Sequence, residues 1–418
     1  MKRFLILAFG FVLMTAATPV TAQQVRYHVK IDEATPTIAK VTMTLPTRRD
    51  GRALYSRAGD NQTKTQVANV NCAGKTIEPD ARGRWRLPGA CRTINWDVNL
   101  IVEGDEGIAG FDQKSVLMKS RRWWVFASPS ALLRLTREPR SLKITFDVPH
   151  QEPFDARLPS ASRPPAYFAL GDYKQESVRR NGVILNYISD DPEYTSQFVK
   201  PDDHAAALSY MSKVLGVSQA GSTQEITMIM MGIIRDRGVL GGAAGSNAMI
   251  VNYIYENEKS REMERYLPIL VALHEQFHQL YSGTSHPVWV TESLAHYYAT
   301  KAILKIYPDN KVVEGIVNEL YQADRGDVPG LLEINRQVDE ERKFDHYNQF
   351  YSLGSAYWKK IDDLIASGSG GSNSLDDYLA DIMRMTFRKG VGIPLRFRDQ
   401  IRYVGDDDLE KIEADYLF

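Results

Sequence analysis

The hydrophobic pattern of this chain changes near residue 184, and that change constrains the fold more than any other feature of the sequence. From Val25 to about Val183, short segments rich in β-branched and aromatic residues, such as VRYHVKI and SLKITFDV, alternate with turn formers. After residue 184, longer segments with helical spacing dominate, with a few buried strands between them. Runs of strands followed by runs of helices indicate an α+β protein. We expect an N-terminal β-sandwich-like domain at residues 23–183 and a mixed α/β and helical domain at residues 184–418.

The first 22 residues have the pattern of a cleaved signal peptide. Lys2 and Arg3 precede an apolar run from Phe4 to Met14, and small residues that end at Ala22 follow. The apolar run is too short to anchor the mature chain across a bilayer, and no cysteine follows it to carry a lipid. We therefore expect a secreted or periplasmic protein without a stable membrane anchor.

The charge of the chain bears on its partners. The formal net charge is -1 at pH 7, and Lys and Arg are spread along the sequence without a basic block. This distribution gives no reason to expect binding to nucleic acid or to an anionic membrane surface. No pattern in the sequence indicates an oligomeric state.

Cys72 and Cys91 are the two cysteines of the chain. In an exported protein we expect them to form a disulfide, which stabilises the folded state by roughly 3 kcal/mol in the chain-entropy model. Neither cysteine belongs to a CxxC pair, so the sequence does not indicate cysteine-bound zinc or thioredoxin-like redox chemistry.

The stretch HEQFH, residues 274–278, is the main candidate for a functional site. It lies in YLPILVALHEQFHQLY, where an apolar stripe with helical spacing predicts a helix. Residues four apart share one face of a helix, so His274 and His278 can bind one metal ion. Glu275 lies beside them and can reach a metal-bound water without binding the ion itself. A catalytic zinc site would need a third protein ligand and an open position for water.

Three residues after the motif are candidates for the third ligand: His286, Glu292 and His296. His286 lacks the spacing and the glycine of the metzincin pattern. Glu292 and His296 lie one turn apart in a second helical segment, WVTESLAHYYATKAILKIY, so geometry alone does not separate them. Elsewhere, His204 is expected at the surface, in the first turn of an earlier helix.

The two helical segments together resemble the zinc-binding region of the gluzincin metallopeptidases. HEQFHQLY followed by WVTESLAHYYA is similar to the glycyl aminopeptidase family and its aminopeptidase-N-like relatives, in which a Glu on a second helix stands in a W-x-x-E-G-x-A-x-Y setting. Trp289 and Glu292 match this setting, whereas Ser293 replaces Gly and the loop between the helices is shorter than in aminopeptidase N. The resemblance implies one Zn²⁺ per chain, held by His274, His278 and Glu292.

A second block of the sequence extends the resemblance. YSLGSAYW is similar to the family's Tyr-x-x-Gly-Ala motif, whose Tyr hydroxyl stabilises the oxyanion. This match nominates Tyr351, although Tyr347 and Tyr357 lie close by in the sequence. The following SNSLDDYLADIM resembles the SLDD segment of the same family, and its Ser374 and Asp377 are placed to cap a helix.

A third block departs from the family. Aminopeptidase-N-like enzymes carry a Gly-x-Met-Glu-Asn segment before HExxH, whose Glu binds the free amino group of the substrate. This chain has GSNAM there, without a carboxylate. We still expect this segment to bind substrate, because it can offer an edge strand to a peptide backbone. Its residues are Gly245, Ser246, Asn247, Ala248 and Met249.

The resemblance implies an exported zinc metallopeptidase with a thermolysin-like catalytic domain that hydrolyses a peptide or protein substrate. In the implied mechanism a zinc-activated water attacks the peptide bond, Glu275 is the general base, and Tyr351 stabilises the oxyanion. Aminopeptidase and endopeptidase activity both remain open. The alternative is a catalytically inactive, metallopeptidase-like binding protein whose zinc is structural and has a fourth protein ligand, such as His296.

Overall fold

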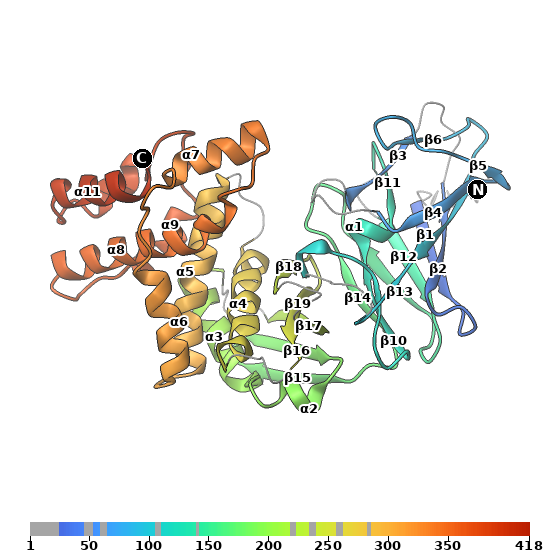
Figure 1. Cartoon of the computed structure of the whole chain (residues 1–418), viewed down its shortest axis with the longest axis horizontal. Coiled ribbons are helices and arrows are strands. Elements are labelled where there is room, and N and C mark those ends of the chain that lie inside the picture. The colour runs from blue at the N-terminus through green and yellow to red at the C-terminus, as the bar shows by residue number, and fades with distance from the viewer. Residues whose placement is uncertain are drawn as a thin grey trace, which may run out of the picture.

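The computed structural model describes residues 25–45, 53–58, 65–104, 110–138, 142–217, 223–233, 240–255, 262–281 and 286–418. The predicted signal peptide lies outside these residues. In Figure 1 the strands of the N-terminal half lie at the right, the helices of the C-terminal half lie at the left, and a further sheet lies between them.

Strands such as Val25–Ile31 and Leu142–Asp147 alternate between buried side chains and more exposed ones, which is the pattern of strands with one face on a core. Within the described residues the strands of the N-terminal half form three sheets. The largest has the order β13 (Phe154–Leu158), β12 (Leu142–Asp147), β1 (Val25–Ile31), β2 (Ile38–Thr44), β7 (Thr93–Asn99), β4 (Val67–Cys72) and β5 (Lys75–Thr76). The second contains β14 (Tyr167–Gly171), β10 (Trp123–Ala127), β9 (Val116–Leu117) and β8 (Ile101–Val102), and the third contains β11 (Leu133–Leu135), β3 (Ala53–Ser56) and β6 (Trp85–Arg86).

These three sheets share one hydrophobic core, in which Trp96 and Trp124 are fully buried. The indole N–H of Trp96 donates to the carbonyl of Ala131 at 2.9 Å, so burial leaves no polar atom of this ring unpaired. The predicted disulfide is present and joins Cys72 to Cys91, with their Cα atoms 6.0 Å apart.

A mixed sheet opens the second half of the chain. Its order is β15 (Gln175–Arg180), β16 (Val183–Ser189), β17 (Gln224–Ile233), β19 (Met249–Ile254) and β18 (Gly242–Ala244). The three inner strands are parallel, and the two edge strands are antiparallel to their neighbours. Because β15 belongs to this sheet, sheet membership changes after Gly171, earlier than the expected boundary at residue 184. Strand β15 is an exposed, polar edge strand.

The two halves pack through an apolar cluster of their own. Trp123 and Val125 of β10 lie in it together with Ile229 of β17 and Ile250 of β19. Trp123 is therefore a core residue. This packing fixes the mixed sheet against the N-terminal strands.

Helices cover the other side of the mixed sheet (Figure 1). The α-helices of the described residues are α1 (Ser128–Ala131), which lies in the N-terminal half, and α2 (Pro192–Thr195), α3 (Pro201–Val214), α4 (Leu267–Leu280), α5 (Val288–Ile306), α6 (Lys311–Tyr321), α7 (Leu331–Arg336), α8 (Ser352–Gly368), α9 (Leu379–Ile382), α10 (Leu395–Gln400) and α11 (Asp406–Tyr416). Helix α4 packs on β18 and β19, α5 packs on α4, and α8 packs on α5. In the part of the chain that the structure describes, no helix has the length and apolarity needed to cross a membrane.

Candidate metal centre

Helix α4 carries both histidines of HEQFH on one face. Its expected apolar stripe is buried, and Pro268 stands in the first turn, where its missing N–H is tolerated. His274 is buried, while Glu275 and His278 are half-buried. The four-residue spacing places the two imidazole rings with their centroids 4.7 Å apart.

Helix α5 brings a carboxylate to these imidazoles, because Glu292 lies near its N-terminal end. One carboxylate oxygen of Glu292 lies 3.1 Å from Nε2 of His274, and the other lies 3.6 Å from Nε2 of His278. The Nε2 atoms of the two histidines are 3.1 Å apart. Each of the three residues thus offers one ligand atom within 4.8 Å of the others.

These separations suit a zinc ion. Zinc binds imidazole nitrogen and carboxylate oxygen at about 2.0–2.2 Å with tetrahedral angles, so its ligand atoms lie about 3.3 Å from one another. Two imidazoles and one carboxylate are also a donor set of catalytic zinc sites, which keep a fourth position for water. Within the described ranges, no other group of His, Cys, Asp and Glu side chains is close enough to hold a metal ion.

The other two candidates for a third ligand do not join the group. His286 lies against Phe387, with ring centroids 5.2 Å apart. The His296 ring lies 5.5 Å from the His274 ring. Burial, reinforced by the charge of His274, lowers the pKa of His296 to about 3, so this imidazole is neutral at pH 7.

The charges of the three residues depend on one another. Burial alone would raise the pKa of Glu292, but His278 and His274 outweigh burial and hold that pKa well below its usual range. Burial would likewise lower the pKa of His278, but Glu292 and then Glu275 raise it above its ordinary value. Because metal ligands must be deprotonated, metal binding to this group would release protons.

Glu275 points toward the edge of the mixed sheet and does not belong to the group of three ligand atoms. Its Oε2 accepts a hydrogen bond from the backbone N–H of Ala244 in β18, at 2.7 Å. A Cβ atom at Gly242 would lie only 2.9 Å from Cγ of Glu275, so glycine permits the close approach of β18 to α4. The carboxylate of Glu275 is therefore held beside the candidate ligands by the sheet.

Two tyrosines cover the group from the segment before α8. The Tyr351 ring packs on the rings of His274 and His296, with centroids 5.3 Å away in both cases. The Tyr347 ring lies 5.9 Å from the Tyr351 ring, and its hydroxyl interacts with Glu292. Burial, followed by the charge of Glu292, raises the pKa of both tyrosines, so both hydroxyls keep their protons at neutral pH. The contact of Tyr347 with Glu292 had no signal in the sequence beyond nearness to Tyr351.

Close packing of α5 and α8 brings Tyr351 to the group. A Cβ atom at Gly354 would lie 2.3 Å from Cβ of Ser293, so the two helices touch at this glycine. Ser293 accepts a hydrogen bond from the Trp358 indole at 2.8 Å, and the ring of Trp358 stacks on Trp289. The serine that departs from the family setting therefore bonds the tryptophan of the opposite helix.

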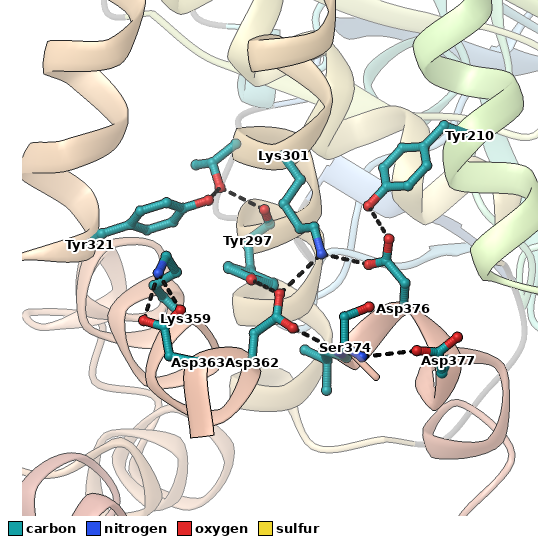
Figure 2. A network of polar contacts seen from close by, with 12 residues as sticks. Tyr210, Tyr297, Lys301, Tyr321, Lys359, Asp362, Asp363, Ser374, Asp376 and Asp377 are labelled. Atoms are coloured by element: carbon teal, nitrogen blue, oxygen red, sulfur yellow. Dashed lines mark hydrogen bonds and ion pairs between the residues drawn. The ribbon is translucent and has the colours of Figure 1, made fainter. Parts of the chain in front are cut away.

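A partly buried polar network fixes α5 against the helices behind it (Figure 2). Nζ of Lys301 lies 3.0 Å from Oδ2 of Asp362 on α8 and 2.6 Å from Oδ1 of Asp376. Tyr210 of α3 donates to Asp376 at 2.8 Å, and Tyr297 donates to Asp362. The network thereby ties the helix of the candidate carboxylate ligand to three other segments.

The SLDD segment is part of this network. Ser374 and Asp377 form the predicted capping box, and the N–H of Ser374 donates to Oδ2 of Asp377 at 2.8 Å. The segment forms a 3-10 turn, Leu375–Asp377, followed by α9, whereas we expected a helix to begin at once. The N–H of Leu375 donates to Asp362 at 2.7 Å, which joins the segment to α8.

The GSNAM segment follows the edge strand and does not form it. The edge strand is β18, Gly242–Ala244, and Met249 is the first residue of the inner strand β19. Ala248 and Met249 are buried. The predicted edge strand at residues 245–249 is therefore corrected to residues 242–244. Glycine and alanine have low β-propensity, so the sequence pattern did not reveal this strand.

A cavity of about 530 Å³ lies beside the candidate centre. Gly245, Ser246 and Asn247 line it together with His278 and Gln279 of α4. Residues 159, 163 and 164 of the N-terminal half form another part of its wall. Three of the five residues predicted to bind substrate thus face a cavity that reaches a candidate metal ligand.

His204 is buried, which corrects our expectation of a surface residue. Its Nε2 lies 2.7 Å from Oε1 of Gln276, the central residue of HEQFH. Burial lowers the pKa of His204 to about 4, so the ring is neutral at pH 7. This contact supports α4 from the side opposite the candidate ligands, because α3 packs there against α4 and α5.

Comparison with solved structures finds proteins that resemble this chain over most of its length. An aminopeptidase N family protein from Idiomarina loihiensis matches with a TM-score of 0.67 at 13% identity, over 94% of this chain and 76% of that chain. An M1 zinc metallopeptidase from Deinococcus radiodurans matches with a TM-score of 0.49 at 12% identity, over 94% of this chain and 93% of that chain. No protein-family model and no curated protein matches the sequence. The first of these likenesses establishes that the chain has the α+β fold of an aminopeptidase N family protein.

Proposed function

We propose that this protein is an exported zinc metallopeptidase that hydrolyses peptide bonds. The group of His274, His278 and Glu292 carries the proposal, because its ligand atoms have the chemistry and the separations of a zinc site. The shared fold with an aminopeptidase N family protein supports it. Bound zinc would lower the pKa of a water molecule and polarise the scissile carbonyl.

The side chains around the group would supply the remaining chemistry. Glu275 would take a proton from the attacking water as general base and then give it to the leaving amine as general acid. The Tyr351 hydroxyl, which keeps its proton at neutral pH, would donate a hydrogen bond to the oxyanion. The cavity beside His278, which Gly245, Ser246 and Asn247 line, would bind the peptide substrate.

Two observations support the export part of the proposal. The sequence before Gln23 has the charged, apolar and small-residue regions of a signal peptide. The disulfide between Cys72 and Cys91 suits an oxidising compartment such as the periplasm or the extracellular space.

The alternative function, that of a catalytically inactive binding protein with a structural zinc, is less favoured. A structural zinc site is closed by four protein ligands, whereas the described residues bring three ligand atoms together. His296 lies nearby but is not one of them.

Metal content and hydrolysis, measured together, test the proposed function. The purified mature protein is expected to contain about one zinc per chain and to cleave unblocked or internally quenched peptides. A chelator should abolish cleavage, and added zinc should restore it. Protein that binds no zinc when zinc is supplied would refute the metal site. Zinc-loaded protein that cleaves neither kind of peptide would favour the binding protein.

The role proposed for Tyr351 has its own test. Tyr351→Phe should lower kcat by about 100-fold, because one hydrogen bond to the oxyanion is lost, while KM and zinc content stay near the wild-type values. Tyr347→Phe removes a hydroxyl that interacts with Glu292 and should weaken zinc binding instead. If Tyr347→Phe alone lowered kcat, the oxyanion role would belong to Tyr347.

A further inference from the structure

The edge strand β18 presents backbone groups to helix α4. In an antiparallel pair, the backbone groups of successive residues point alternately toward the partner strand and away from it. The carbonyl of Gly241 accepts the N–H of Asn252 at 3.0 Å, and Ala243 has the same phase two residues on. The N–H groups of Gly242 and Ala244 therefore point away from β19.

One of these outward N–H groups, that of Ala244, holds the side chain of Glu275 beside the candidate metal ligands. The N–H of Ala244 donates to Oε2 of Glu275 at 2.7 Å. The absence of a side chain at Gly242 allows this approach, since a Cβ atom there would lie 2.8 Å from Val271 and 2.9 Å from Glu275. The orientation of this carboxylate is thus set from the edge of the sheet.

The turn that follows β18, which contains Ser246 and Asn247, is hydrogen-bonded to the N-terminal half. The side-chain amide of Asn247 accepts the N–H of Tyr167 at 3.0 Å and donates to the carbonyl of Tyr167 at 2.6 Å. The backbone N–H of Ser246 donates to the carbonyl of Pro165 at 2.6 Å. Tyr167 is fully buried in β14, so the amide of Asn247 is fixed to a rigid strand.

We propose that Ala244 and Asn247 are positioning residues, through which the N-terminal half holds Glu275 in the orientation needed for proton transfer. The inference rests on the proposed peptidase function. Such anchoring matters because displacement of a reacting group by about 1 Å can cost about 100-fold in rate. Ala244 acts through its backbone N–H. Asn247 acts by fixing the turn that follows Ala244.

Ala244→Pro tests the first contact, because proline lacks the N–H. The substitution is compatible with the strand, since proline is tolerated at an edge where the N–H does not join the ladder. We expect kcat to fall between about tenfold and 100-fold, with KM, zinc content and melting temperature near the wild-type values. Ala244→Ser keeps the N–H, so it should keep most of the kcat that Ala244→Pro loses. A rise in KM at unchanged kcat would overturn the inference, because the N–H would then serve the substrate.

Asn247→Ala tests the second contact, and the chain offers a matched control. Within the N-terminal half, the side-chain amide of Gln66 bonds the backbone of Ser115 as Asn247 bonds that of Tyr167. It accepts the N–H of Ser115 at 2.6 Å and donates to its carbonyl at 2.9 Å. Both Asn247→Ala and Gln66→Ala should lower the melting temperature. Only Asn247→Ala should lower kcat, by about tenfold, when rates are measured per folded, zinc-loaded protein at a temperature where both variants are native.

Three outcomes decide between the inference and the function on which it rests. Equal loss of kcat in Asn247→Ala and Gln66→Ala would mean that general destabilisation, not positioning, lowers the rate. Active wild-type protein with unchanged kcat in both Ala244→Pro and Asn247→Ala would overturn the inference alone. Wild-type protein that holds zinc and cleaves no peptide would refute the proposed function and the inference together.

Discussion

Glu275→Gln is expected to lower kcat by about 10³–10⁴-fold while zinc stays bound. The amide has nearly the shape of the carboxylate, and its oxygen can still accept the N–H of Ala244, which Glu275 accepts at 2.7 Å in the wild type. It cannot take a proton from water at neutral pH, so proton transfer is lost while the surroundings are kept. Steady-state kinetics with a quenched peptide and elemental analysis on the same sample measure both effects.

The control for this change is the same substitution elsewhere in the helical half. Glu314→Gln on α6 replaces a carboxylate that forms an exposed pair with Lys311, at 2.7 Å. Surface pairs of this kind contribute little to stability, so kcat and zinc content should stay at wild-type values. If Glu275→Gln kept more than about one-tenth of the wild-type kcat, Glu275 could not be the general base.

The sequence predicted those features of the site that depend on the geometry of a single helix or strand. The apolar stripe of α4 and the four-residue spacing of His274 and His278 follow from helix geometry alone. The alternation of buried and exposed residues in β1 is likewise a local property. The choice of Glu292 over His296 needed a family resemblance, because residues one turn apart on a helix look alike in sequence.

The parts that the sequence missed depend on contacts between elements. The edge strand Gly242–Ala244 consists of residues with low strand propensity and is held by pairing with β19. His204 lies in a first helical turn, where exposure is the rule, but α4 packs over it and supplies Gln276 as a partner. Tyr347 reaches Glu292 because the turn Tyr347–Phe350 before α8 packs on α5, and no local sequence pattern predicts this contact.

Glu292→Ala is expected to weaken zinc binding by more than about 100-fold and to abolish nearly all hydrolysis. Loss of a residue that merely supports a ligand costs about 10–100-fold in metal affinity, and loss of a ligand itself should cost more. In the variant the imidazoles of His274 and His278, with Nε2 atoms 3.1 Å apart, would be the two ligands left of the three. Competition with a chelator of known zinc affinity, followed at constant pH, measures the loss.

His296→Ala is the comparison that gives this result its meaning. The His296 ring lies 5.5 Å from the His274 ring but outside the group of three ligand atoms, so its removal should leave zinc affinity within about threefold of wild type. If both variants lost zinc to the same extent, the metal would have four protein ligands, and a closed site leaves no position for the attacking water. A large loss of zinc affinity in Glu292→Ala but not in His296→Ala would mean that the fourth position is open to water. Peptide hydrolysis with Glu275 as general base requires that open position.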